Sequence, residues 1–349
     1  MSTSARALAV AGIVAVALVI AGATAAATGL LAPVIGQLSG PANEPLVPAA
    51  TPPPIAPSPS PEPTESPLPS PSPSPPGADP LLGSDGRFTV LLLGSDYRPA
   101  HPGNRTDAII VVSVEPTSGK TAAFSVPRDT VEFPLPGGGV YTPKVNALYQ
   151  HLQATTGHGG TAMKQVVGEA FGIEVDWYVL IGFPGVRQLV DAIGGVDVTL
   201  ERAYYDPYYW VTSKKQGWGL PAGTSHLDGT NALIFARSRK GDNDFERARR
   251  QQLLVMATVE KVRSLGPGVL PKLLTIAAKT VQTDLPLDQA PRLFEVVAAA
   301  DLGSAERVVF GPRTYAEGRA GSSFALKLDV CRRWIAQHFP PAKGSTGAG

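Results

Sequence analysis

The sequence has almost none of the residues that hold disulfide-rich and zinc-dependent proteins together. It contains one cysteine, Cys331, among 349 residues, which excludes an internal disulfide framework and a cysteine-based metal cluster. The five histidines are His101, His151, His158, His226 and His338. Their spacing is unlike that of zinc ligands, so we do not expect a zinc hydrolase.

The motifs of several common enzyme classes are missing as well. Beyond residue 84 there is no GxSxG, HExxH or GxGxxG, and the glycine-rich "PLPGGG" is not followed by the GK[ST] of a P-loop. Lysine and arginine number 30 and aspartate and glutamate 29, so the chain has no overall field that would attract nucleic acid. Nucleic acid is therefore not an expected partner, and any basic site must be local.

Charge is absent from residues 7–36, an apolar stretch longer than the roughly 20 residues that cross a bilayer. Arg6 precedes it, which predicts that residues 1–6 are a cytoplasmic tail and that the rest of the chain is extracytoplasmic. A cleaved signal peptide is the alternative, because small residues stand at Ala25 to Ala27. In either case we expect the working domain outside the cell membrane, held in the first case by a single-pass anchor.

Apolar residues are too sparse in residues 37–84 to build a core, and proline and serine dominate instead. Proline-rich chains favour extended polyproline II at about 3.1 Å per residue, so roughly 40 residues could span on the order of 120 Å. We interpret this stretch as a linker. One catalytic domain at residues 85–340 and a disordered tail at 341–349 complete the expected organisation.

Three short apolar runs follow the linker: residues 87–95 ("RFTVLLLGS"), 108–116 ("AIIVVSVEP") and 121–127 ("TAAFSVP"). Continuous runs of this length are typical of strands buried on both faces. Their short connections favour antiparallel neighbours, so we expect a three-stranded meander.

Such a meander would gather charged residues at one edge of the sheet. Asp96 ends the first strand, Arg105 and Asp107 begin the second, and Arg128 and Asp129 follow the third. The alternative is that these charges only mark the points where strands reach solvent. The cluster of both signs nevertheless makes this edge a candidate site.

The rest of the domain alternates helices with strands. One or two helices are expected between Val145 and Phe171, and residues 176–200 have the pattern strand, turn, helix, glycine cap, strand. This alternation predicts an α/β fold in which helices flank a central mixed β-sheet. The aromatic residues 202–219 are expected to form an irregular loop, which either lines a glycan or lipid groove or packs on the sheet.

A second charged cluster lies further along the chain. If "LIFARSR" is a strand, Arg237 and Arg239 point to the same face. The next segment looks helical, with Arg247, Arg250 and Gln251 on one stripe. Guanidinium groups bind phosphate oxygens in pairs, so these elements predict an anion pocket.

The second cluster also has a structural interpretation. Arginines at the start of a helix oppose its dipole unless an anion is near. Asp242, Asp244 and Glu246 could supply that anion within the chain. The arginines would then be solvated ion pairs and no pocket would be needed.

A series of motifs now resembles one family. The segments "LLLGSDYR", "NRTDAIIVVSV", "FSVPRDT", "KVNALY", "LVDAIGGVDV" and "LDGTNALIFARSRKGDNDFERARRQQ" occur in the order of the LytR-CpsA-Psr family, from about Phe88 to Met256. The resemblance implies a membrane-anchored enzyme that faces the cell wall, with a transmembrane helix before a central mixed sheet flanked by helices. It implies transfer of a glycopolymer from a polyprenyl-pyrophosphate carrier to a muramic acid hydroxyl of peptidoglycan, through a phosphodiester.

The resemblance also implies the site. Asp96 and Asp107 would bind Mg²⁺ and would form the catalytic set with two of the arginines, Arg105 and Arg128. The pyrophosphate would be bound by Arg105, Arg128, Lys144, Arg237, Arg239, Arg247 and Gln251. The long linker departs from the compact family pattern.

Two other functions remain open from the sequence. The same site could admit water in place of a sugar hydroxyl, which would make the protein a pyrophosphatase. It could also bind a lipid-linked ligand without catalysis, as a membrane sensor would.

Overall fold

The computed structural model describes residues 79–97, 104–286, 289–319 and 321–342. The expected anchor at residues 7–36 and nearly all of the linker lie outside the described residues. Among the helices that the structure describes, none is long and apolar enough to span a membrane.

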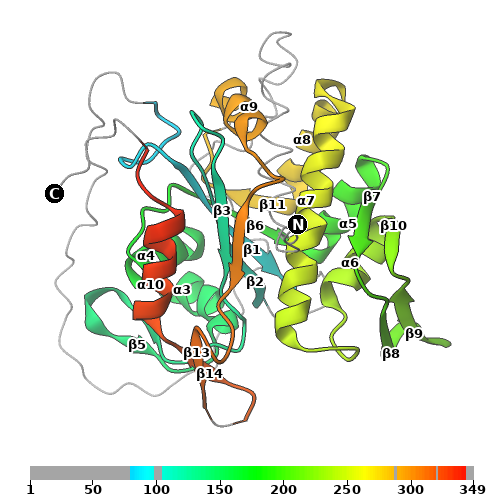
Figure 1. Cartoon of the computed structure of the whole chain (residues 1–349), viewed down its shortest axis with the longest axis horizontal. Helices are drawn as coiled ribbons and strands as arrows, with labels where there is room; N and C mark the ends of the chain where they lie inside the picture. The colour runs from blue at the N-terminus through cyan, green and yellow to red at the C-terminus, as the bar shows by residue number, and fades with distance from the viewer. Residues whose placement is uncertain (1–78, 98–103, 287–288, 320, 343–349) are drawn as a thin grey trace.

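A mixed sheet of six strands forms the centre of the domain (Figure 1). Its order is β11-β6-β1-β2-β3-β12, and the strands are β1 (Phe88–Ser95), β2 (Thr106–Val114), β3 (Thr121–Ser125), β6 (Trp177–Gly182), β11 (Val281–Thr283) and β12 (Glu306–Val309). The first three strands form an antiparallel meander, which confirms the sequence prediction. Strand β6 runs parallel to β1, and β12 runs parallel to β3.

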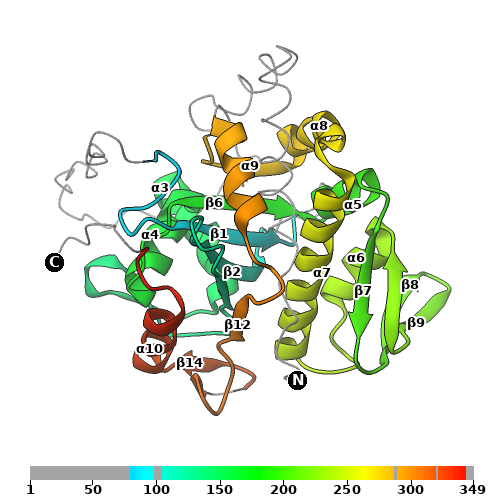
Figure 2. The ribbon, with the colours of Figure 1, turned by 45° about the horizontal axis from the view of Figure 1, so that its top comes forward.

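The sheet is covered on both faces, because alternate side chains of its central strands enter two separate cores. Leu91 and Leu93 of β1 pack with helices α3 (Leu148–Thr156), α4 (Gly159–Phe171) and α10 (Leu328–His338). Val90 and Leu92 pack on the opposite face. Its helices are α5 (Phe183–Ala192), α6 (Gly229–Arg237), α7 (Asp244–Leu265), α8 (Leu270–Thr280) and α9 (Ala290–Ala299). Figures 1 and 2 show the two helical layers on either side of the sheet.

The smaller elements lie around this sandwich. Strands β7 (Val196–Leu200) and β10 (Gly223–Leu227) pair with each other. The remaining pairs are β4 (Phe133–Pro134) with β5 (Val140–Tyr141), β8 (Tyr204–Thr212) with β9 (Lys215–Leu220), and β13 (Ala316–Gly318) with β14 (Phe324–Leu326). Short 3-10 turns occupy Pro136–Gly138, Val145–Ala147 and Pro267–Val269.

Two local expectations were wrong. The segment "LIFARSR" is not a strand but the end of α6, because the carboxylate of Asp228 accepts the N–H of Asn231 at 2.7 Å and starts a helix there. Arg237 therefore ends the helix, and Arg239 follows it in the connection to α7. Residues 202–219 are not an irregular loop, since most of them belong to the β8–β9 hairpin.

Candidate active site

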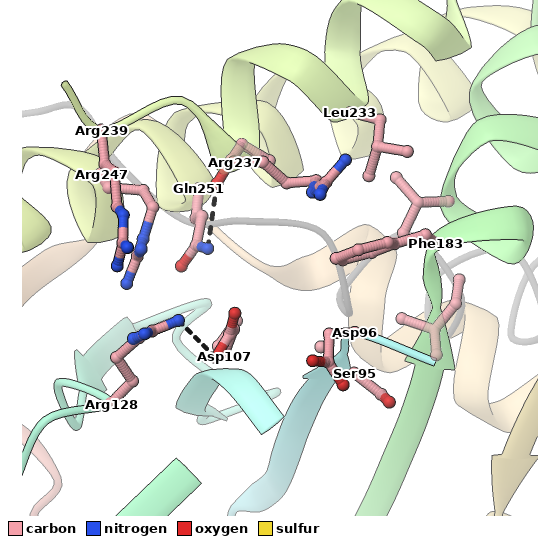
Figure 3. Close-up of a pocket in the computed structure, with 15 residues that line it drawn as sticks. Ser95, Asp96, Asp107, Arg128, Phe183, Leu233, Arg237, Arg239, Arg247 and Gln251 are labelled. Carbon is pink, nitrogen blue, oxygen red and sulfur yellow. Dashed lines mark hydrogen bonds and ion pairs between the residues drawn. The ribbon is translucent and has the colours of Figure 1, made fainter. Parts of the chain in front are cut away.

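A cavity of about 240 Å³ opens at the edge of the sheet where β1 ends and β2 begins (Figure 3). The sheet edge forms one wall, and α5, α6 and the start of α7 form the others. Its polar lining includes Asp96, Asp107, Arg128, Arg237, Arg239, Arg247 and Gln251. Both charged clusters of the sequence therefore meet in one place.

The two aspartates of the cavity come from the β1–β2 turn. Asp96 follows β1, and its Oδ1 accepts the N–H of Arg105 at 2.8 Å, which closes the turn. The strand register passes from Gly94 opposite Ala108 to Ser95 opposite Thr106, so Asp107 is an extra residue in β2. A bulge of this kind re-aims a side chain. It explains why a residue inside a buried strand reaches the cavity.

Arg128 faces Asp107 across the sheet edge. Its Nη1 lies 2.8 Å from Oδ1 of Asp107, which also accepts the side-chain amide of Asn146 at 3.2 Å. The meander places both residues here, because β3 returns the chain to the edge at which β2 begins. This ion pair links the acidic and basic halves of the site.

Helix α7 supplies the opposite wall. Arg247 and Gln251 are one turn apart and share a face. Gln251 donates from Nε2 to the carbonyl of Ala236 at 3.1 Å, which fixes its amide against the end of α6. Figure 3 shows Arg239 and Arg247 side by side, opposite Arg128.

Several guanidinium groups of the cavity have donors to spare. The Nε atoms of Arg128 and Arg247 are buried and have no hydrogen-bond partner among the described residues. Burial lowers the pKa of Arg247, although the carboxylate of Asp244, 3.0 Å away, opposes that shift. Buried donors without partners are unfavourable, so this arrangement fits an anion that would complete them.

Behind the arginines lies a pair of carboxyl groups, Asp129 and Asp244. Burial opposes the ionisation of Asp129, but hydrogen bonds from Asp244 and Lys144 hold its pKa below the usual value. Burial raises the pKa of Asp244, and its hydrogen bond to Asp129 raises it further. The pKa of Asp129 is thus lowered while that of Asp244 is raised, and the two carboxyl groups pair with Lys144 and Arg247 respectively.

The other end of the cavity is apolar, with Ile181, Phe183, Val186 and Leu233 in its lining. The guanidinium of Arg237 lies 4.2 Å from the ring centre of Phe183, a cation–π contact that joins the apolar end to the basic end. The neighbouring residues Tyr178, Val179 and Leu180 of β6 are core, whereas Ile181 and Phe183 line the cavity.

Two residues implied by the family resemblance do not line the cavity. Arg105 is exposed on the turn, and its charge acts on Tyr141. Lys144 donates to Asp129 at 2.6 Å and to Ser322 at 3.4 Å. Their role in binding stays a prediction.

The structural interpretation of the second cluster holds for part of it. Arg250 pairs with Asp242 and lies over the ring of Tyr204, so it is a packing residue and not part of the cavity. Arg249 pairs with Glu246 on the surface. Asp242, Asp244 and Glu246 do form ion pairs with arginines of this segment. The guanidinium of Arg239 has no acidic partner among the described residues.

Sequence reasoning missed one supporting residue, Asp206, which carried no motif. Asp206 is fully buried and accepts from the hydroxyl of Ser238 at 2.7 Å and from the N–H groups of Arg239 and Lys240 at 3.1 and 2.9 Å. It holds the arginine-bearing connection in place from the β8–β9 hairpin.

The donors present fit a magnesium ion. Asp96 and Asp107 line the same cavity, and Mg²⁺ takes one or two protein carboxylates while substrate oxygens and water complete its shell. Within the described ranges there is no group of three or more His, Cys, Asp or Glu that could hold a metal by protein ligands alone. The site therefore suits a metal that arrives with, or is shared by, a phosphate-bearing substrate.

Comparisons with known sequences give the same family. The sequence model of the LytR_cpsA_psr family matches residues 66–310. A polyisoprenyl-teichoic acid–peptidoglycan teichoic acid transferase, TagU of Oceanobacillus iheyensis, is 33% identical over 215 residues, which is 60% of this chain and 63% of the relative. TagU of Bacillus mycoides is 31% identical over 205 residues, 58% and 61% of the two chains. The match thus spans less than two thirds of these relatives.

Solved structures have the same fold. TagT of B. subtilis is 26% identical with a TM-score of 0.53, and the match covers 73% of this chain and 91% of TagT. A structure described as TagT bound to LIIa-WTA is 25% identical with a TM-score of 0.55, covering 75% and 92%. Protein gbs0355 of Streptococcus agalactiae, 22% identical, reaches 0.58 over 73% and 88%. The central mixed sheet flanked by helices is therefore the fold of this group.

Proposed function

Since the chain belongs to the LytR_cpsA_psr family, we propose that it is a phosphotransferase that moves a glycopolymer from a polyprenyl-pyrophosphate carrier to peptidoglycan. Its relatives are named as transferases of teichoic acid from a polyisoprenyl carrier to peptidoglycan. The glycan of this chain's own donor need not be teichoic acid.

The basic cavity with unpartnered guanidinium donors carries this proposal. Four arginines and two aspartates line it, so its formal charge is 4 − 2 = +2. A diphosphate diester bears a negative charge on each phosphorus and could accept hydrogen bonds from the Nε atoms of Arg128 and Arg247, which have no hydrogen-bond partner among the described residues. The apolar end at Phe183 and Leu233 suits the first carbons of a polyprenyl chain.

The reaction then needs positioning more than covalent chemistry. An acceptor hydroxyl of the wall sugar attacks the phosphorus nearer the glycan, and a new P–O bond forms there. The P–O bond to the second phosphorus breaks, polyprenyl phosphate leaves with the bond's electron pair, and the proton of the hydroxyl passes to the leaving phosphate. Arg239 and Arg247 would neutralise charge on the diphosphate, and Gln251, held by Ala236, would fix its orientation.

We propose Mg²⁺ as the cofactor, with Asp96 and Asp107 as the residues that would hold it. Bound there, the ion would stabilise negative charge on the phosphoryl oxygens. Two carboxylates cancel the charge of one such ion, so the arginines must still neutralise the diphosphate. This division explains why the sheet edge bears both signs while α6 and α7 contribute chiefly positive charge.

The proposed donor and acceptor set the place of work. A polyprenyl carrier resides in the membrane and peptidoglycan lies outside it, so we propose that the domain works on the wall side of the cell membrane. The apolar residues 7–36 would anchor it there as a single-pass segment.

Incubation of the protein with lipid-linked glycan, Mg²⁺ and peptidoglycan tests the function. Linked polymer supports transfer, phosphorylated glycan without linkage supports a pyrophosphatase, and unchanged bound ligand supports a sensor. The D107N variant should lose transfer and keep its circular dichroism spectrum and Tm, whereas D329N, at an exposed carboxylate on α10, should transfer normally. Normal transfer by folded D107N, with unaltered Mg²⁺ dependence, would refute the role of Asp107.

A further inference from the structure

The β8–β9 hairpin presents three aromatic side chains to solvent beside the cavity. Tyr205, Tyr208 and Trp210 are 62%, 65% and 58% exposed. No other large hydrophobic side chain among the described residues is as exposed, the next being Val140 at 54%. Solvent-exposed aromatics in a cluster are typical of a surface that contacts something else.

The backbone puts these rings on one face. The pairing of β8 with β9 is irregular between Asp206 and Trp210, and the carboxylate of Asp206 accepts the N–H of Tyr208 at 3.0 Å. This irregularity leaves Asp206 and Tyr209 on the inner face, and it leaves Tyr205, Tyr208 and Trp210 on the outer face. Gly217 in β9 supports Tyr205, because a Cβ there would collide with its hydroxyl.

The exposed charge of the hairpin is entirely positive. Between residues 204 and 220 the charged residues are Asp206, Lys214 and Lys215. Asp206 is fully buried and hydrogen-bonded, whereas both lysines are exposed at the tip next to the aromatic face. Tyrosine and tryptophan with flanking lysine are the residues that favour the interface of an anionic bilayer.

The hairpin is fastened to the cavity from its inner face. Arg237 donates from Nη1 to the hydroxyl of Tyr209 at 3.3 Å and lies over Phe183 at the apolar end. Asp206 binds the backbone of Arg239 from the same strand. The outer aromatic face and the cavity are therefore parts of one rigid unit.

We propose that the outer face of the β8–β9 hairpin docks on the anionic surface of the membrane and so brings the cavity to its lipid substrate. The inference rests on the proposed function, in which the donor is lipid-linked. In that function the donor must be taken up at the bilayer surface, because its polyprenyl carrier resides in the membrane. The mouth of the cavity must then approach the membrane, and the charge and aromatic content of the hairpin suit that contact.

Quenching of tryptophan emission by brominated lipid tests the docking. The full chain is reconstituted in vesicles of brominated phosphatidylcholine with and without phosphatidylglycerol, as wild type and as W210F. The other tryptophans are Trp177, Trp218 and Trp334. In anionic vesicles we expect a quenched component of the tryptophan emission that the W210F variant lacks. The affinity of the hairpin for these vesicles should weaken by roughly fivefold for each lysine removed, in K214Q and in K215Q. The matched control K120Q, at an exposed lysine of another turn, should not change it.

Three results would overturn the proposal. One is equal quenching in the wild type and W210F, and another is a quenched Trp210 component that is the same in neutral vesicles. The third is a shift of Trp210 emission on adding soluble chito-oligosaccharide together with no quenching by vesicles, which would assign the face to glycan.

A transfer assay in detergent with a short-chain, water-soluble donor separates this proposal from the proposed function. The hairpin variants should match the wild type there, because their effect needs a bilayer, and a loss in this assay would mean that the hairpin acts on catalysis instead. A wild type that fails to transfer this donor would count against the proposed function and leave the quenching result intact.

Discussion

Arg247 is the most buried of the four arginines that line the cavity. It is 5% exposed, it pairs with Asp244 through Nη1, and its Nε faces no partner among the described residues. One side of its guanidinium is therefore fixed by the protein, while its buried Nε keeps an unused donor. Such a fork is pre-organised, which a lysine at the same place could not reproduce.

The R247K variant should lower kcat/KM for transfer by roughly 10- to 100-fold, since a hydrogen bond to a charged group contributes about 1.5–3 kcal/mol. Steady-state kinetics with lipid-linked donor measure the loss. The control R249K alters a surface ion pair two residues away and should leave kcat/KM unchanged. If R247K and R249K behaved alike, Arg247 would not contact the diphosphate.

The buried carboxyl of Asp176 makes the free energy of unfolding depend on pH. Burial of its carboxyl raises its pKa well above the usual value, and nearby Glu174 and Asp85 raise it further, although Thr89 donates its N–H at 2.6 Å. The folded-state pKa exceeds the unfolded one, so this group's contribution is fully present below the unfolded value and is lost as pH rises through the folded value.

The D176N variant keeps an acceptor for Thr89 and removes this titration. We expect its free energy of unfolding to gain on that of the wild type as pH rises from about 4 to 8, measured by urea denaturation. The control D329N, at an exposed carboxylate, should show no such trend. A difference between D176N and the wild type that is independent of pH would contradict the assignment.

At the scale of single residues, the sequence predicted the gathering of charges but not their partners. Asp96, Asp107 and Arg128 could be placed together because strand order alone brings strand ends to one edge. The bulge at Asp107 and the ion pairs of Arg250 depend on tertiary contacts that no local pattern encodes. The family resemblance carries no information on side-chain direction. It therefore gave no sign that Arg105 and Lys144 lie outside the cavity.

Among the elements, α7 matters most for the site, and its first turn carries Arg247. Asn243 caps that turn by accepting the N–H groups of Phe245 and Glu246 at 2.9 and 3.0 Å. Asp244 and Glu246 in the same turn offset the unfavourable placement of arginines near a helix N-terminus. The orientation of Arg247 thus depends on an intact helix start.

The N243A variant should lose about 1 kcal/mol of stability, because the two N–H groups lose their acceptor. Fraying of the first turn should also raise KM for the lipid-linked donor. Thermal unfolding and kinetics measure the two effects. The N243D variant restores an acceptor and should recover both, whereas equal stability of N243A and N243D would show that the cap contributes nothing.

The elements that the sequence misassigned share one physical cause. The alternation of apolar and polar residues in "LIFARSR" is compatible with a strand as well as with the last turns of a helix. The signal that decides for a helix is the N-cap at Asp228, several residues upstream. The β8–β9 hairpin lacks a regular period because of the irregular pairing between Asp206 and Trp210. Period-based reasoning fails where a strand is interrupted and where a helix ends.

For the whole molecule, the layered fold was predictable because each central strand is apolar on both faces. Leu91 and Leu93 face one helical layer while Val90 and Leu92 face the other, so a run without polar positions requires cover on both sides. Which helices provide that cover, and the position of β12 beside β3, depend on long-range packing. The sequence therefore predicted the layered architecture, but not the order of the outer strands or the helices that cover each face.

The two ends of the described domain lie together, far from the cavity. Ala342 donates its N–H to the carbonyl of Asp85 at 2.8 Å, and Arg87 donates to the carbonyl of Pro340 at 3.2 Å. Strand β1 runs from this point to the cavity over eight residues, about 26 Å at roughly 3.3 Å per residue. A tether that enters before residue 85 therefore attaches at the opposite end of the strand from the active site.

Asp85, near which the tether would attach, and Asp96, at the cavity, lie at opposite ends of β1. A short tether would hold the Asp85 end against the membrane and point the cavity away from it. For the cavity to reach a lipid-borne donor the domain must turn over, so the tether must be longer than β1. A linker able to span on the order of 120 Å meets that condition several times over. Under the proposed function, the length of this linker would set how freely the domain alternates between a membrane-borne donor and the wall.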